Sequence, residues 1–222
     1  SYTVWIDFVI LGLSILFIFT MFYVSMFVHA MMLLVQYRMQ DAPSYKGTGK
    51  RVLVIGDSTA VGCGATHSVP YWLHHTTGWT VDVIARSGAT VMYVDKHWPK
   101  KKYDHYVVMV GGNDLWKMVP LPYVAACFKK FHRKRSVSHI LVYDVRKSSS
   151  LPWFMKWYMH ARQTKLRRML NLDNASYLDL YTNEEYNREL DNHHFLAMDG
   201  VHPSSTANRY IAQQLVQRID NQ

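Results

Sequence analysis

Three polar side chains in this sequence could together cleave an ester or a related acyl bond. Ser58 follows a short apolar run, and Asp199 and His202 lie three residues apart in a later segment. A serine hydroxyl is a weak nucleophile until a base takes its proton, and the usual base is a histidine oriented by a carboxylate. The short spacing lets the Asp199 carboxylate reach the His202 imidazole. We therefore predict a nucleophilic triad of Ser58, His202 and Asp199.

The same reaction needs hydrogen-bond donors for the oxyanion that develops on the attacked carbonyl. Gly88 offers a backbone N–H without a hindering side chain, and Asn113 offers a side-chain amide. Both residues follow apolar runs, as Ser58 does, so we predict that they belong to one site. A purely structural alternative exists for each of them, since Ser, Gly and Asn are also common in helix caps and turns.

The elements that would position these residues alternate along the chain. Short apolar runs rich in β-branched residues predict buried strands, and the segments between them have the length of helices. This alternation indicates a parallel sheet covered on both faces, with any site at the carboxyl ends of its strands. The predicted strands are 51–58 with its terminal turn, 81–85, 106–110, 139–145 and 176–180, and the predicted helices are 66–77, 91–98, 119–133, 152–172 and 204–219.

Four motifs, taken together and in order, resemble those of the SGNH hydrolase superfamily, also called the GDSL-type esterases and lipases. The similarity covers residues 51–219 and implies a three-layer α/β/α sandwich with a five-stranded parallel sheet in flavodoxin-like order. Within the motifs, Asp57 and Asp114 are expected to tie loops together and not to act as the triad acid. The motifs are Gly56-Asp57-Ser58, followed by Thr59 where the commoner form has Leu, then Gly88, Gly111-Gly112-Asn113-Asp114 and Asp199-Gly200-Val201-His202.

The resemblance also implies a mechanism. Ser58 would attack an ester or thioester carbonyl, and His202, held by Asp199, would act first as a base and then as an acid. The oxyanion would be bound by the backbone N–H groups of Ser58 and Gly88 and by the Asn113 side chain. An acyltransferase is a close variant, because an alcohol other than water can resolve an acyl-enzyme.

The beginning of the sequence has a different character. The 28 residues from Phe8 to Val35 contain no Asp, Glu, Lys or Arg. About 20 apolar residues suffice to cross a bilayer core, and Trp5 and Tyr37 suit the aromatic belts at its two surfaces. We predict one transmembrane helix that contacts lipid through residues 5–37. A cleaved signal peptide and a buried core helix are the alternatives.

This leader divides the chain into three predicted segments: a transmembrane helix over 1–39, a polar linker over 40–50 and a hydrolase-like domain over 51–222. Basic residues flank the span only on its carboxyl side, so the positive-inside rule places the domain in the cytoplasm rather than outside it. Many members of the similar superfamily act outside the cytoplasm, which favours the opposite orientation.

Composition limits the remaining possibilities. Hydrophobic residues make up 49% of the 222 residues, which excludes a disordered chain, and two cysteines cannot form a disulfide framework. The net charge of +9 includes a segment over 152–168 that mixes aromatic and basic residues. Such a segment is typical of a helix in a membrane interface, but a solvated basic face and a docking surface for an acidic partner are alternatives. We expect no nucleic acid partner, no metal and no cofactor.

Two functions of different classes follow. The first is a membrane-anchored serine esterase or lipase-type hydrolase that acts on an acyl ester. The second is a hydrolase-like structural or accessory subunit of a larger membrane complex, with membrane protein partners and an unused or occluded site. The presence of all four motifs favours the enzyme.

Overall fold

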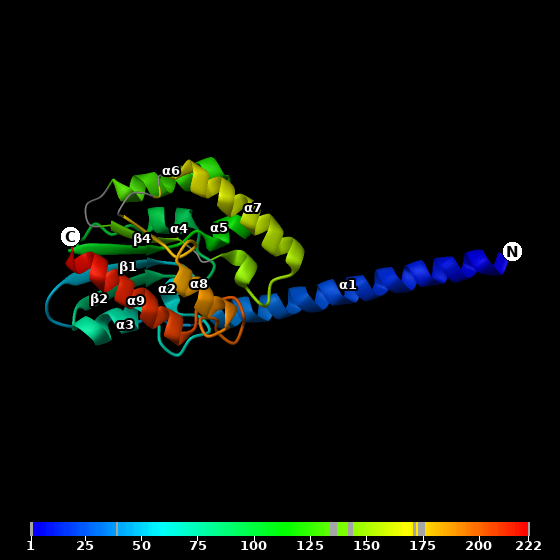
Figure 1. The fold of residues 1–222 in the computed structure, drawn as a ribbon, viewed down its shortest axis with the longest axis horizontal. Helices are drawn as coiled ribbons and strands as arrows, with labels where there is room; N and C mark the ends of the chain where they lie inside the picture. The colour runs from blue at the N-terminus through cyan, green and yellow to red at the C-terminus, as the bar shows by residue number, and fades with distance from the viewer. Residues whose placement is uncertain are drawn as a thin grey trace. The chain divides into compact units, whose positions relative to one another are not determined.

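The computed structural model describes residues 2–38, 40–133, 137–141, 144–170, 172 and 176–221, and it divides into two units, Ser1–Met39 and Gln40–Gln222. The first unit is helix α1 (Tyr2–Arg38) (Figure 1). Its segment Trp5–His29 is long and apolar enough to cross a membrane, and none of its most apolar part is buried. The buried core helix is therefore excluded, whereas a membrane span and a signal sequence both fit these properties.

The second unit is built on a five-stranded parallel sheet with the order β2-β1-β3-β4-β5 (Figure 1). This order confirms the flavodoxin-like sheet that the resemblance implied. The strands are β1 (Arg51–Gly56), β2 (Thr80–Ala85), β3 (His105–Met109), β4 (Val137–Leu141) and β5 (Tyr177–Asp179).

The predicted strand over 139–145 is displaced. The strand itself covers Val137–Leu141, and Val145 already belongs to the 3-10 turn η1 (Val145–Lys147), while residues 142–143 lie outside the described part. The displacement has a physical reason: Val145 is apolar and buried although it lies outside the strand, so the apolar run of the sequence extends past the end of β4. Hydrophobicity alone therefore does not mark where the strand ends.

Helices cover both faces of the sheet and confirm the three-layer architecture. Successive β1 side chains alternate between two cores: Val52 and Val54 pack into one, and Leu53 and Ile55 into the other. The first core is closed by α3 (Val69–Thr77), α8 (Glu184–Asp191) and α9 (Ser205–Asp220), and the second by α4 (Val91–Lys96), α6 (Leu121–His132) and α7 (Trp153–Met169). Two short helices, α2 (Ser58–Val61) and α5 (Gly112–Trp116), follow β1 and β3 at their carboxyl ends.

The residues before β1 lie against the sheet. The backbone of Tyr45 exchanges two hydrogen bonds with Val81 of β2, at 2.8 and 2.9 Å, and the Ser44 hydroxyl accepts one from the N–H of Val83. They cover an edge that would otherwise expose unpaired backbone groups. Farther upstream, the Gln40 side chain donates to the carbonyl of Gly62, just past α2. The chain therefore enters the second unit beside the carboxyl end of β1.

A buried histidine gives this unit a pH-dependent stability. His105 is 2% exposed, its Nε2 lies 2.8 Å from the Ser138 hydroxyl, and burial lowers its pKa to about 4. In the unfolded chain this pKa is about 6.5, so below that pH the unfolded chain binds the extra proton and the fold loses stability. The destabilisation that His105 causes is absent above about pH 6.5 and grows as the pH drops towards 4.

We expect His105 to destabilise the fold by about 3 kcal/mol between pH 7 and pH 4. Urea unfolding of the wild type and of His105→Gln at both pH values checks this. Gln keeps a polar side chain near Ser138 but cannot titrate, so its free energy of unfolding should fall less on acidification. Parallel pH dependence in the two proteins would contradict the assignment.

Candidate active site

The first predicted site residue lies at the carboxyl end of β1. Asp57 is the N-cap of α2, where its Oδ1 accepts a hydrogen bond of 2.9 Å from the N–H of Thr59. Ser58 is therefore the first residue of the helix, and only 8% of it is exposed. The cap fixes the turn between strand and helix, and this turn sets the position of the Ser58 side chain.

The structure brings the three residues of the predicted triad into one hydrogen-bonded chain. His202 Nε2 lies 2.8 Å from Ser58 Oγ, and His202 Nδ1 lies 2.6 Å from Asp199 Oδ2. A carboxylate only accepts hydrogen bonds, so Nδ1 carries the ring proton and Nε2 is left as the acceptor for the Ser58 hydroxyl. This is the tautomer that a general base for Ser58 requires.

The loop that carries Asp199 and His202 is held in two ways. Asp199 Oδ1 accepts the backbone N–H groups of Val201 and His202, at 2.8 and 2.9 Å. Gly200 has φ +65, a conformation that favours glycine, and its carbonyl accepts hydrogen bonds from the Ser148 hydroxyl at 2.7 Å and from the Ser149 N–H at 3.0 Å.

The serine segment 148–150 was not predicted as part of the site. The Ser150 hydroxyl adds a hydrogen bond to the Asp199 carbonyl. In the sequence the only signal was the run of three serines itself. Nothing in that run shows that it lies beside a loop some fifty positions later, because only the fold makes the pairing.

The predicted oxyanion donors lie next to the same turn. Gly88 has φ +77, and the Asn113 amide Nδ2 lies 3.0 Å from the carbonyl of Ala89 and 3.4 Å from Asp57 Oδ2. In the described part of the chain, the backbone N–H groups of Ser58 and Gly88 donate to no other protein group. Two donors are thus left for a ligand, and Asn113 joins the strand ends that carry them.

Two neighbouring residues fix these donors and were also missed in the sequence. The indole Nε1 of Trp116 donates to Asn113 Oδ1 at 3.0 Å, which decides which way the Asn113 amide faces. The ammonium group of Lys117 donates to the Gly88 carbonyl at 2.5 Å and lies 5.4 Å from the centre of the Trp116 ring. Trp116 and Lys117 therefore act as positioning residues.

We expect Trp116→Phe to lower kcat for a soluble ester about fivefold while KM stays nearly constant. The lost hydrogen bond orients Asn113, a predicted oxyanion donor, and a loss of about 1 kcal/mol of transition-state stabilisation corresponds to that change in rate. Trp72→Phe is the matched control, since Trp72 Nε1 is buried without a hydrogen-bond partner in the described residues. A rise in KM with unchanged kcat would instead assign Trp116 to substrate binding.

Neither of the other carboxyl groups near Ser58 replaces Asp199 as the candidate triad acid, and the nearby thiol does not replace Ser58 as the candidate nucleophile. Burial raises the pKa of Asp57 to about 6 and that of Asp114 to about 7. Asp114 accepts the N–H of Val91 at the start of α4, so both carboxyls tie loops together, as predicted. Burial raises the pKa of Cys63 to about 12, so its thiol stays protonated and unreactive at neutral pH.

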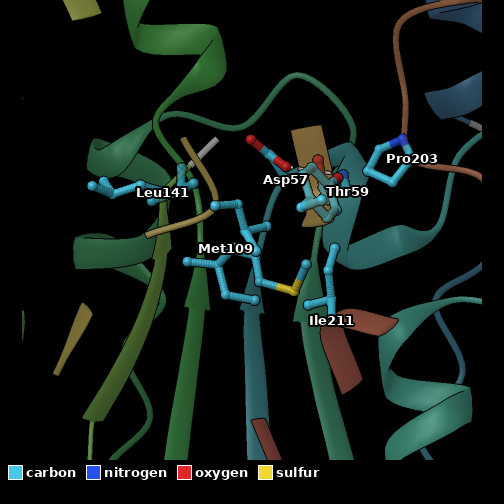
Figure 2. A pocket seen from close by; sticks show the side chains of 10 residues that line it. Asp57, Thr59, Met109, Leu141, Pro203 and Ile211 are labelled. Atoms are coloured by element: carbon cyan, nitrogen blue, oxygen red, sulfur yellow. Dashed lines mark hydrogen bonds between the residues drawn. The ribbon is translucent and has the colours of Figure 1, made fainter. Parts of the chain in front are cut away.

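A small cavity lies between the sheet and the helices below the nucleophile turn (Figure 2). It measures about 20 Å³, room for about one water molecule, and is lined by Asp57, Thr59, Met109, Val110, Ile140, Leu141, Leu180, Tyr186, Pro203 and Ile211. Among the described residues, none is a hydrogen-bond partner of the buried Tyr186 hydroxyl. This cavity suits a water molecule and is too small for a substrate.

Comparison with known proteins agrees with the fold and the motifs. The chain is similar to the lipase Lip_vut3 from a goat rumen metagenome, with a TM-score of 0.59 at 15% identity over 77% of this chain and 97% of the lipase. It is similar to Axe2, an acetylxylan esterase from Geobacillus stearothermophilus, with a TM-score of 0.53 at 23% identity over 78% and 95%. A lipase/acylhydrolase from Enterococcus faecalis gives a TM-score of 0.58 at 17% identity over 78% and 96%. No curated protein sequence matches the chain.

These structural neighbours share the fold. The family itself follows from the sequence, because residues 54–210 match the model of the GDSL-like lipase/acylhydrolase family. The match begins within β1 and ends within α9, so it includes every predicted site residue. This chain therefore belongs to the GDSL-like lipase/acylhydrolase family, within the SGNH hydrolases.

Proposed function

We propose that this protein is a membrane-anchored serine esterase that hydrolyses an acyl ester through Ser58, His202 and Asp199. The observation that carries the proposal is the continuous hydrogen-bonded chain from Asp199 through His202 to Ser58, at 2.6 and 2.8 Å. An accessory subunit with an unused site is not favoured, because nucleophile, base and orienting carboxylate all lie within hydrogen-bonding distance.

The geometry supports a two-step reaction. Ser58 Oγ attacks the acyl carbonyl while its proton passes to His202 Nε2, and Asp199 stabilises the imidazolium that forms. The oxyanion is held by the N–H groups of Ser58 and Gly88, and the Asn113 amide joins them when it turns from its long 3.4 Å contact with Asp57 Oδ2 to the ligand. The imidazolium returns the proton to the leaving alcohol, which breaks the ester bond and leaves an acyl-serine. Water then attacks with His202 as base, which releases the carboxylic acid and restores Ser58.

A fluorophosphonate probe and a series of p-nitrophenyl esters of increasing acyl length test this proposal on the full chain in detergent. We expect covalent labelling of Ser58, identified by mass spectrometry, and turnover of at least one ester. An added alcohol that diverts the acyl group from water would identify the acyltransferase variant. If a folded wild type neither took the label nor hydrolysed any ester, the esterase assignment would be overturned. The accessory subunit would then be the favoured function.

We further propose that α1 remains on the mature protein as its anchor, with the second unit in the cytoplasm. The length and hydropathy of Trp5–His29 support a span, and the basic residues after it support this orientation. Membrane retention after alkaline extraction, together with protease protection of the second unit in intact cells, tests both points. Release as a shortened soluble protein would identify a cleaved signal sequence instead.

A further inference from the structure

The exposed apolar side chains of the second unit are unevenly distributed. Among its described residues, every large hydrophobic side chain that is exposed belongs to a segment at the carboxyl ends of the strands, where Ser58 also lies. They are Met92, Trp116, Met118, Tyr123, Trp153, Phe154, Trp157 and Met198. A soluble surface scatters such residues singly, whereas a gathering at one edge marks an interaction site. We call these eight side chains the apolar rim.

The rim surrounds the candidate active site on several sides. Met198 precedes Asp199 and is fully exposed, and Trp116 bonds to Asn113. Met92 lies in the first turn of α4, which Asp114 caps. Trp153 begins α7 only three residues after Ser150, whose hydroxyl bonds to the Asp199 carbonyl, so the chain holds α7's first turn within roughly 11 Å of that loop.

The largest part of the rim is the tip of α7. Trp153 is 79% exposed and Trp157 is 70% exposed, one turn apart on the same side of the helix. The basic residues of α7 that continue this stripe, Lys165 and Arg168, are about 18–22 Å farther along the axis. The aromatic part therefore points to the active-site edge, and the helix presents its tip there rather than its whole length.

The exposed tryptophans and two exposed basic residues beside them favour a lipid bilayer as the occupant. Arg86 and Lys117 are exposed in loops at the same edge, beside the apolar rim, and suit anionic headgroups. Trp, Tyr and Lys are the side chains that settle in the headgroup region. The second unit also begins at this edge, since Gln40 donates to the carbonyl of Gly62, four residues after Ser58.

We propose that the apolar rim binds the surface of a bilayer, so that an ester dissolved in the membrane reaches Ser58 without crossing water. The inference rests on the proposed esterase function and adds its substrate class, a membrane-resident acyl ester with an apolar chain. Rim residues would enter the headgroup region, and the acyl carbonyl would rise between them to the oxyanion donors. A soluble protein partner on the same rim would leave these side chains away from lipid.

Site-specific fluorescence tests the surface independently of catalysis. Cys63 and Cys127 are buried, so a cysteine introduced at the surface takes an NBD label selectively in the folded protein. Labels at Met92→Cys on α4 and Trp157→Cys on α7 report the rim, and Gln217→Cys, exposed in the last turn of α9, reports the opposite edge. The full chain is placed in phosphatidylcholine vesicles that contain phosphatidylglycerol and a doxyl-labelled lipid.

We expect both rim labels to emit at shorter wavelength and to be quenched by the doxyl lipid, while the Gln217→Cys label remains unquenched. Equal and weak quenching at all three positions would overturn the proposal. This outcome does not depend on whether the protein hydrolyses anything. Reporters on two separate helices guard against a local effect of one substitution.

An assay of catalytic activity is the second test of the proposal. Two activities are compared: turnover of a fluorescent diacyl lipid in the vesicle, and turnover of soluble p-nitrophenyl acetate. In Trp153→Ser/Trp157→Ser, we expect the ratio of the first to the second to fall at least about fivefold. Gln213→Ser/Gln217→Ser on exposed positions of α9 is the control and should keep the wild-type ratio. An unchanged ratio in the tryptophan variant would contradict membrane delivery of substrate. Absence of both activities in the wild type would instead refute the esterase assignment and leave the fluorescence result to decide the surface.

Discussion

Ser58→Ala should lower ester hydrolysis by about 10⁴- to 10⁶-fold and abolish fluorophosphonate labelling. The hydroxyl of Ser58 is the nucleophile that His202 Nε2 reaches at 2.8 Å. The substitution removes only that group, because Asp57, not Ser58, supplies the cap of α2. We therefore expect an unchanged fold, which circular dichroism and thermal unfolding can check beside the kinetics.

The companion variant His202→Ala should lose activity to a similar extent, and the double variant should be little worse than either one. Residues that act as one unit show this lack of additivity. Once one of them is removed, the unit no longer functions, so removing the other causes little further loss of rate. Labelling that persists in Ser58→Ala would reveal a different nucleophile. Cys63 is a poor candidate for it, because burial raises the pKa of its thiol to about 12.

Asp199→Asn should lower kcat by about 10³- to 10⁴-fold, although the side chain keeps its size. Asp199 Oδ1 accepts two backbone N–H groups, from Val201 and His202, so an amide at this position places its oxygen there and its NH₂ group towards the ring. The NH₂ group then donates to His202 Nδ1. The ring proton moves to Nε2, which can no longer accept the Ser58 proton.

The pH dependence of kcat and the nitrogen chemical shifts of the His202 ring measure this effect directly. Asp57→Asn is the matched control, because it replaces the other carboxylate near Ser58, one that accepts from the Thr59 N–H and the Asn113 amide. It should lose much less activity than Asp199→Asn. If the two variants lost activity equally, or if Asp199→Asn retained wild-type kcat, the orienting role of Asp199 would be wrong.

The amino-acid sequence determined the fold class because the sheet is buried on both faces. Strands such as β1 then appear as continuous apolar runs, and the helices between them appear as longer segments, so their alternation already implies a parallel sheet. The same rule places the residues after each strand at one edge, which is why Ser58, Gly88 and Asn113 could be named together. The spacing of Asp199 and His202 is local, so it too was readable.

The tertiary structure alone decided how that edge is held and what surrounds it. The clamp of Ser148 on Gly200, the bond of Trp116 to Asn113 and that of Lys117 to Gly88 each depend on how loops from different strands meet. Hydrogen bonds need an approach within about 3 Å and a favourable angle. Composition and periodicity carry no information on that scale between distant loops.

The apolar rim illustrates the same division. The sequence identified the aromatic and basic residues of 152–168 as unusual, and helical periodicity could suggest which of them share a face. Whether those side chains are buried or exposed, and which strand ends lie beside them, follows only from packing, because a buried tryptophan and an exposed one have the same local pattern. The sequence thus determined the chemistry at the strand ends, and the fold decided which surface surrounds it.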